Sequence, residues 1–154
     1  MWYFEQRSAM RAAKKLFKSY FKAGVPKKVD KDLGMFKIMD KPSHDKDYSR
    51  LSFMAKEYHT YDFTVKYRRE GAMEFTIKGY DFNLPSPCPA IGEIKAKYPT
   101  CRVNFDKDWV LLTFVEKNIE NVRDFKENVK SFISLWNDTD LFKLVEDLRK
   151  IQTL

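Results

Sequence analysis

The feature that most constrains the fold is a strict alternation of apolar and polar residues that begins at Tyr61 and resumes at Met73. A period of two is that of a β-strand with one face in the core and the other in water. Glu70-Gly71, between the two runs, supplies a turn. The sequence therefore predicts an antiparallel hairpin over 61–80. Its apolar face is formed by Tyr61, Phe63, Val65, Tyr67, Met73, Phe75 and Ile77.

A second hairpin is predicted over 101–116, with its turn at residues 106–108. The return strand, WVLLTFV (109–115), is apolar on both of its faces. Strands of this kind are typical of sheet interiors, because both faces are then removed from water. We therefore expect this segment to be a central strand covered by helices.

Shorter elements are predicted on either side of the first hairpin. Pro89 is suited to the first position of a short helix near 89–98, because proline lacks the N–H that this position would leave unpaired. Pro99 ends that helix. Segments 35–40 and 50–58 are expected to be extended.

The C-terminal third is predicted to form two helices within 119–154. Asn121, followed three residues later by Asp124, resembles a capping arrangement, and apolar residues then keep a helical period as far as Trp136. The polar segment WNDTD interrupts the period, and a final helix is expected to start at Asp138 or Thr139. Its inward residues are Leu141, Leu144, Val145, Leu148 and Ile151.

Together these elements predict a single α+β domain over 1–154, in which an antiparallel sheet of hairpins is covered by an N-terminal helix and two C-terminal helices. The expected parts are a basic amphipathic helix over 1–24, mainly strands with the short helix over 35–116, and the two helices over 119–154. The apolar fraction is 44% and there are only five glycines, which favours a packed core over disorder.

The N-terminal helix is predicted to be amphipathic. Residues 2–23 lack Gly and Pro, and Gly24 with Pro26 provides a helix end. On a helical wheel the cationic and apolar residues fall in opposite sectors. The cationic sector holds Arg7, Arg11, Lys14, Lys15, Lys18 and Lys22, and the apolar sector holds Ala9, Met10, Ala13, Leu16, Phe17, Tyr20 and Phe21.

The net charge of +7 is concentrated in this part of the chain. Residues 1–31 carry nine basic and two acidic side chains, whereas the other 123 residues carry 20 of each sign. Such an asymmetry indicates a basic arm or helix with a polyanionic partner. A cationic track along one helix face can follow a phosphate backbone and release its counterions.

We therefore predict a non-enzymatic protein that binds nucleic acid, DNA or RNA, through this helix with little sequence preference, since phosphate contacts position a protein without specifying a sequence. Polar residues of the first hairpin are expected to add a second contact, with Tyr58 or Tyr80 available to stack on bases. The candidate nucleic-acid-binding residues are Arg7, Arg11, Lys14, Lys15, Lys18, Lys22, Lys27, Lys28, Lys66 and Arg68.

Several kinds of chemistry have no signature in the sequence. No two of the five glycines lie within three residues of each other, so neither GxGxxG nor a Walker A loop is present. Cys88 and Cys101 lie 13 residues apart with neither histidine near them, which disfavours a zinc site. We accordingly expect no cofactor and no bound metal.

Two alternative functions stay open. The short chain, rich in Lys, Phe and Tyr, resembles in style the small accessory proteins of bacteriophages, which suggests an inhibitor or modulator that docks on a host enzyme. A small metal-independent RNase is the other alternative, with His59 and His44 as acid and base and Lys46 or Lys56 holding the phosphate.

The compartment is predicted from the cysteines and from the hydropathy of the chain. There is no secretory hydrophobic region and no apolar run of 18 residues, so a reducing cytoplasm and free thiols are expected. The apolar stripe of the N-terminal helix could also meet a membrane surface, but a chain of this length needs that stripe to cover its sheet. We therefore expect no membrane partner.

Overall fold

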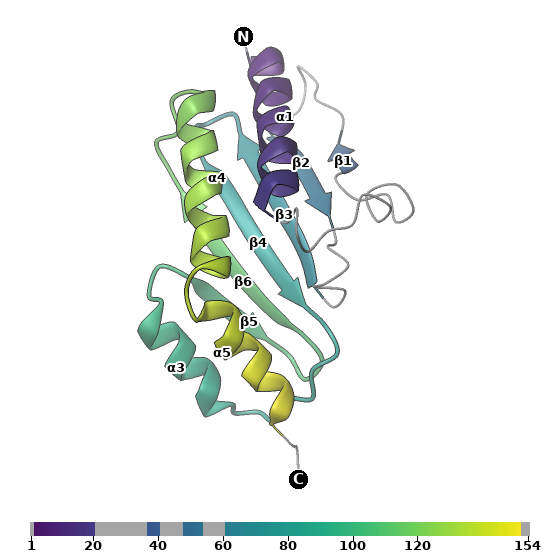
Figure 1. The fold of residues 1–154 in the computed structure, drawn as a ribbon, viewed down its shortest axis with the longest axis vertical. Coiled ribbons are helices and arrows are strands. Elements are labelled where there is room, and N and C mark those ends of the chain that lie inside the picture. The colour runs from purple at the N-terminus through teal and green to yellow at the C-terminus, as the bar shows by residue number, and fades with distance from the viewer. Residues whose placement is uncertain (1, 21–36, 41–47, 54–60, 152–154) are drawn as a thin grey trace.

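The computed structural model describes residues 2–20, 37–40, 48–53 and 61–151, and shows one α+β fold (Figure 1). The helices of this part are α1 (Trp2–Tyr20), α3 (Pro89–Lys97), α4 (Val122–Asn137), α5 (Leu141–Asp147) and the short 3₁₀ helix η2 (Leu148–Lys150). The strands are β1 (Lys37–Asp40), β2 (Tyr48–Phe53), β3 (Tyr61–Arg68), β4 (Met73–Gly79), β5 (Arg102–Phe105) and β6 (Val110–Glu116). The predicted order of helices and strands is confirmed.

The strands form one antiparallel sheet in the order β1-β2-β3-β4-β6-β5. At its centre is the predicted hairpin of β3 and β4, in which Val65 pairs with Phe75. Its turn requires glycine: Gly71 has φ +80°, and a Cβ there would lie 2.8 Å from the carbonyl oxygen of Ile119. The Ile119 N–H in turn donates to the Gly71 carbonyl at 2.6 Å. This turn therefore also fixes the chain between β6 and α4.

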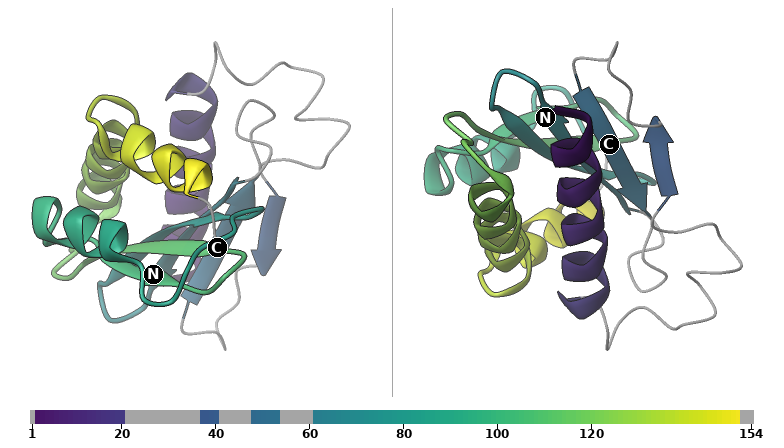
Figure 2. Two further views of the ribbon diagram at one scale, coloured as in Figure 1. Left: turned by 90° about the horizontal axis from the view of Figure 1, so that it is seen from below. Right: turned by 90° about the horizontal axis from the view of Figure 1, so that it is seen from above.

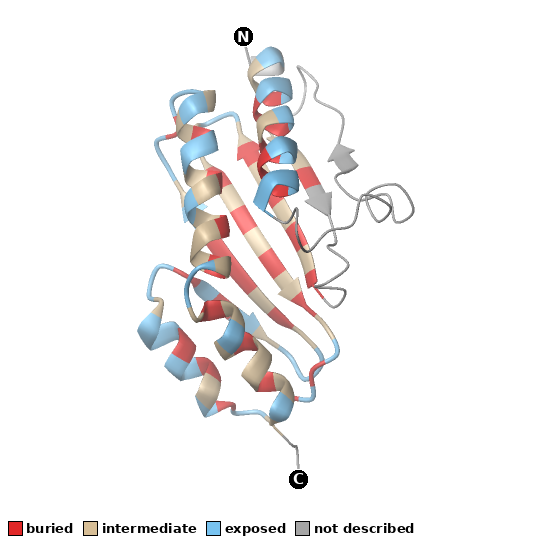
Figure 3. Cartoon of the chain, viewed as in Figure 1, coloured by how far each residue is buried: buried red, intermediate tan, exposed pale blue. Residues whose placement is uncertain are grey.

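The two faces of the sheet differ because the side chains alternate. On β3 and β4 every second residue is buried and the residues between are only half-buried (Figure 3). Helices α1, α4 and α5 lie together over the buried face, as the two end-on views show (Figure 2). No helix or strand of the described residues covers the other face, which we call the open face.

Strand β6 is an interior strand, as expected, and the helices of the described residues cover one of its faces. It lies between β4 and β5, with Leu112 and Phe114 buried on the helix side. On the open face, Leu111 is half-buried and Val115 is 43% exposed. Within the described residues the expected cover by helices is therefore found on one face of β6, and its other face ranges from the buried Thr113 to the exposed Val115.

Helix α1 is divided as the sequence predicts except at Tyr20, which was expected on the apolar side and is 38% exposed. Its buried residues follow a helical period and include Phe17, whose ring centroid lies 5.9 Å from that of Phe75 in β4. The predicted helix extends to residue 23, and positions 21–24 lie outside the described residues. The core positions of α1 are Ala9, Met10, Ala13, Leu16 and Phe17.

The C-terminal helices differ from prediction at two boundaries: the last helix begins later than expected, and it ends at Asp147, after which residues 148–150 form the 3₁₀ helix η2 and Ile151 lies beyond it. The Asn121 side chain caps α4 by accepting from the Asp124 N–H at 2.9 Å, as expected. Helix α5 begins at Leu141 rather than at Asp138 or Thr139. The reason is that Asp138 still belongs to the end of α4, where its N–H donates to the Ser134 carbonyl at 2.7 Å.

Replacement of Phe17 tests whether α1 is part of the core. Phe17→Ala removes a fully buried ring and is expected to lower the free energy of unfolding by about 3–5 kcal/mol. Phe4→Ala is a matched control on the same helix, because Phe4 is 60% exposed, and should cost less than about 1 kcal/mol. Urea unfolding of both variants measures the difference. Equal costs for the two substitutions would contradict the packing of α1.

Candidate nucleic-acid interface

The cations of α1 project away from the sheet. Arg7, Arg11, Lys14, Lys15 and Lys18 are all exposed. From Arg7 to Lys18 the helix rises by about 17 Å at 1.5 Å per residue, which is the length of the described track. Among residues 2–20 the only carboxylate is Glu5. The exposed face of α1 is therefore a strongly positive strip, which we call the cationic face.

Helix α4 lies beside α1 on the same side of the sheet and has a mixed surface (Figure 2). Its exposed cations Arg123 and Lys126 alternate with acidic residues, and Lys130 pairs with Glu127 at 3.8 Å. Opposite charges on the same helix face neutralise one another at a distance. The positive potential of the helical layer is consequently centred on α1 rather than on α4.

The structure separates two groups of residues that the sequence analysis had joined in one site. Lys66 and Arg68 alternate with Val65 and Tyr67, which face the helices, so their side chains lie on the open face. Helix α1 packs on the opposite face. The sheet therefore stands between the two groups, and they do not form one continuous surface with α1.

Other predicted site residues lie outside the described residues. These include part of the proposed cationic track and both histidines of the RNase hypothesis. The structure accordingly adds nothing to the assignment of these positions, which are Lys22, Lys27, Lys28, His44, His59 and Tyr58.

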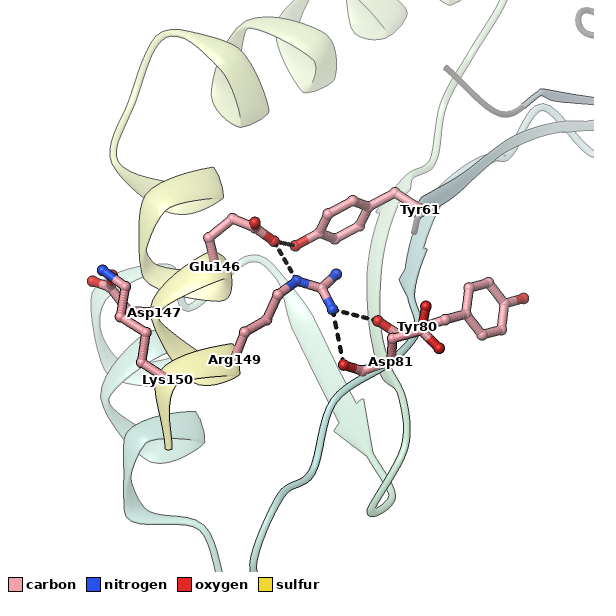
Figure 4. Close-up of polar contacts among 7 residues, drawn as sticks. All are labelled: Tyr61, Tyr80, Asp81, Glu146, Asp147, Arg149 and Lys150. Carbon is pink, nitrogen blue, oxygen red and sulfur yellow. Dashed lines mark hydrogen bonds and ion pairs between the residues drawn. The ribbon is translucent and has the colours of Figure 1, made fainter. Parts of the chain in front are cut away.

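A partly buried polar cluster joins the C-terminal helices to the sheet (Figure 4). Glu146 of α5 accepts from the Tyr61 hydroxyl and, at 2.6 Å, from Arg149 Nε. Arg149 also donates to the carbonyls of Tyr80 and Asp81, the latter at 3.3 Å. We call these contacts the Arg149 clamp. Sequence reasoning missed it because Tyr61 and Glu146 are 85 residues apart, and no local pattern marks such a pair.

The geometry of the Arg149 clamp is structural rather than catalytic. The guanidinium lies over two aromatic rings, with Cζ 3.9 Å from the centroid of Phe82 and 5.0 Å from that of Tyr61. Tyr61 is 1% exposed, and its burial, reinforced by the bond to Glu146, raises the pKa of its hydroxyl above the ordinary value. The Tyr61 hydroxyl is neutral and buried and already donates its hydrogen bond to Glu146, so a substrate cannot reach it.

A groove of about 360 Å³ runs between α3 and α5. Its floor is apolar, with Ile94 and Leu148 buried and Leu144 half-buried, and Glu93 and Asp147 lie along its wall. Asp140 accepts from Lys97 and from the Tyr98 hydroxyl, and thereby holds α3 against the start of α5. The groove has no cluster of acid, base and nucleophile.

The two cysteines are buried free thiols, as the sequence analysis expected. Desolvation by burial raises the pKa of Cys101 to about 12, so its thiol is protonated at neutral pH. A protonated thiol is a poor nucleophile and a poor metal ligand. Within the described part of the chain, His, Cys, Asp and Glu form no group of three or more that could hold a metal ion.

Two further observations complete the description of the site. Of the helices that the structure describes, none combines the length and the apolar character needed to cross a bilayer. Comparisons of the chain with protein-family models, with curated proteins and with solved structures found no match. The functional argument therefore depends on the residues themselves.

Tyr61→Phe tests the Arg149 clamp through its pH dependence. A raised pKa in the folded state means that the neutral hydroxyl contributes stability below about pH 10 and that this contribution is lost as the pH rises further. Tyr61→Phe should cost about 1 kcal/mol at neutral pH, and its deficit relative to the wild type should shrink above about pH 10. Urea unfolding across this range gives the measurement.

The exposed Tyr20 offers a control for this experiment, because Tyr20→Phe removes the same hydroxyl from the surface of α1. Its unfolding free energy should follow that of the wild type at every pH. A deficit of Tyr61→Phe that stays constant from neutral to alkaline pH would show that the Tyr61 hydroxyl is not held neutral by the fold.

Proposed function

We propose that this protein is a non-enzymatic nucleic-acid-binding protein that uses the cationic face of α1. The observation that carries the proposal is that the two faces of this helix have different roles. Its apolar residues are buried in the core, whereas Arg11, Lys14 and Lys15 are exposed to solvent and do not contribute to the packing. Burial of the apolar stripe also argues against its insertion into a membrane surface.

The chemistry of binding is electrostatic. Lysine and arginine side chains along one helix face meet successive phosphates and release the counterions condensed on the nucleic acid. Each phosphate contact on a duplex contributes about 0.9 to the slope of log affinity against log salt concentration. Because the contacts are made to phosphates and not to base edges, binding has little sequence preference.

A second candidate function is supported by the groove between α3 and α5. Its floor of Ile94, Leu144 and Leu148 is apolar, and its walls carry charges of both signs. Surfaces with an apolar centre and a polar rim are typical of protein interfaces. The groove thus favours the hypothesis of a protein-binding modulator, which stays second because the groove accounts for none of the excess positive charge in α1.

Charge reversal on α1 tests the first proposal. Lys14→Glu with Lys15→Glu should leave the melting temperature nearly unchanged, since both side chains are exposed. The same variant should weaken binding to a short DNA duplex by about tenfold or more at low salt and reduce the salt slope by about 2. Fluorescence anisotropy over a series of salt concentrations measures both quantities.

Lys95→Glu with Lys143→Glu is the matched control. It changes the net charge by the same amount, but at exposed lysines of α3 and α5, which lie away from the cationic face of α1. This control should bind the duplex nearly as the wild type does. Equal loss of binding in both variants would reduce the effect to net charge alone, and no loss in the α1 variant would contradict the proposal.

A further inference from the structure

The open face of the sheet has a composition of its own. By register it carries more cations than carboxylates, and three aromatic residues stand at its two ends. On β2 to β6 and the residues next to them, the cations are Arg50, Lys66, Arg68, Lys78 and Arg102, the carboxylates are Asp62 and Glu74, and the aromatic residues are Tyr48, Tyr80 and Trp109; β1 adds Lys37 and Asp40 by register. This face is positive, and its aromatic rings are not part of the core.

At both ends a cation lies over an aromatic ring. The Lys78 Nζ is 5.3 Å from the ring centroid of Tyr80 and 5.0 Å from that of Trp109. At the other end, Lys66 Nζ and Arg68 Cζ lie 5.6 Å and 5.7 Å from the centroid of Tyr48. Each aromatic group is thus accompanied by a positive charge within the distance of a cation–π contact.

The carboxylates of the open face already have partners there. Glu74 pairs with Arg68 at 3.4 Å, and Asp62 hydrogen-bonds the Tyr80 hydroxyl. Neither Lys66 nor Lys78 has an ion pair within the described residues. In register, Lys66 stands opposite Glu74 and Lys78 opposite Asp62, yet each carboxylate contacts another residue, Arg68 or Tyr80. The two ammonium groups, one at each end, can therefore still pair with an anion from outside.

The two aromatic groups are separated by a polar strip. Along β3, the six steps from Asp62 to Arg68 span about 20 Å at about 3.3 Å per residue. Midway lies a row of threonines paired in register across three strands, Thr64 with Thr76 and Thr76 with Thr113. Thr64 and Thr76 are half-buried, and their hydroxyl groups offer hydrogen bonds to a polar ligand that crosses the sheet from one aromatic group to the other, whereas Thr113 is buried.

We infer that the open face binds single-stranded nucleic acid, with bases stacked on Trp109, Tyr80 and Tyr48 and with Lys78 and Lys66 paired to phosphates. Rings interleaved with cations on a sheet surface match the two parts of a nucleotide, a flat base and an anionic phosphate. A duplex does not fit this chemistry, because its bases are already stacked on each other and present only their edges.

A protein partner or a second copy of this chain fits the open face less well. The centres of protein interfaces are apolar and depleted in charge, whereas here the polar threonine row occupies the centre, with the charged pair of Lys66 and Glu74 next to it. Two copies meeting by this face would also bring like charges together, which is unfavourable. The apolar residues present, Leu111 and Val115, lie toward the β5 side and form no large patch.

This inference rests on the proposed function in one respect only, namely that the ligand is a nucleic acid. Its surface is the face of the sheet opposite to α1, so the two contacts can be tested separately. Bases are required on the open face, whereas phosphates alone suffice for the cationic face of α1. An oligonucleotide without bases therefore distinguishes them.

The experiment measures the affinity of the full chain for oligo(dT), for an abasic oligonucleotide of equal length and for a short duplex. The wild type should prefer oligo(dT) to the abasic strand, and Trp109→Ala should weaken oligo(dT) binding by about 5-fold to 150-fold, the range of one lost stacking contact. Trp109→Phe keeps a ring and should retain most of the affinity. Duplex binding should be unchanged in both variants.

Tyr48→Ala, at the other end of the face, is a second test variant in case Trp109→Ala does not fold. If circular dichroism shows that Trp109→Ala is unfolded, Tyr48→Ala and the preference of the wild type for oligo(dT) decide the matter. Lys14→Glu with Lys15→Glu should weaken duplex binding and leave the ratio of oligo(dT) to abasic affinity unchanged. That ratio remains informative even if the α1 proposal fails.

Three results would overturn the inference. Equal affinity for oligo(dT) and the abasic strand would show that bases are not recognised. Unchanged oligo(dT) affinity in both Trp109→Ala and Tyr48→Ala would show that these rings do not stack on bases. A loss of self-association in Trp109→Ala by analytical ultracentrifugation, without any effect on oligo(dT), would assign the open face to a second copy of the chain.

Discussion

The structure depends on the burial of one face of the antiparallel sheet, and Phe75 is at the centre of that burial. Its ring centroid lies 5.9 Å from Phe17 of α1, 5.9 Å from Phe132 of α4 and 6.2 Å from Phe114 of β6. Phe114 and Phe132 stack on one another at 5.4 Å. One aromatic cluster thus joins two helices to two strands, and the burial of these large rings contributes more to stability than any exposed ion pair of the fold.

This constraint explains where the charges lie. Because the apolar side of α1 packs against the sheet, its cations can only lie on the side that faces solvent. They therefore form one continuous strip along the helix. The same constraint leaves the second face of the sheet mainly to polar residues, and the aromatic residues there, Tyr48, Tyr80 and Trp109, are not required by the core. Both candidate surfaces are therefore those that the packing of the fold does not use.

Much of the fold follows from local patterns in the sequence. The alternation around Gly71 predicts the central hairpin, the Asn121 cap predicts the start of α4, and the wheel of α1 predicts which side is buried. Long-range contacts have no such signal: nothing near Arg149 in the sequence indicates the carbonyls of Tyr80 and Asp81. The same holds for Lys78 beside Trp109, which only the pairing of β4 with β6 brings together. By contrast, the alternation at Val65 already implies that Lys66 faces away from α1. The sequence-based prediction of the binding site did not take this into account.

The central claim is that α1 binds through one face and holds the core through the other. Residue-resolved NMR of the full chain during titration with a short DNA duplex tests this claim most directly. The account predicts that the largest amide shifts fall on residues 7–18 of α1 and disappear at high salt, while the amides of Phe75 and Ile77 in β4 stay nearly unchanged. Largest shifts on α3 and α5, or shifts that high salt does not reverse, would contradict it.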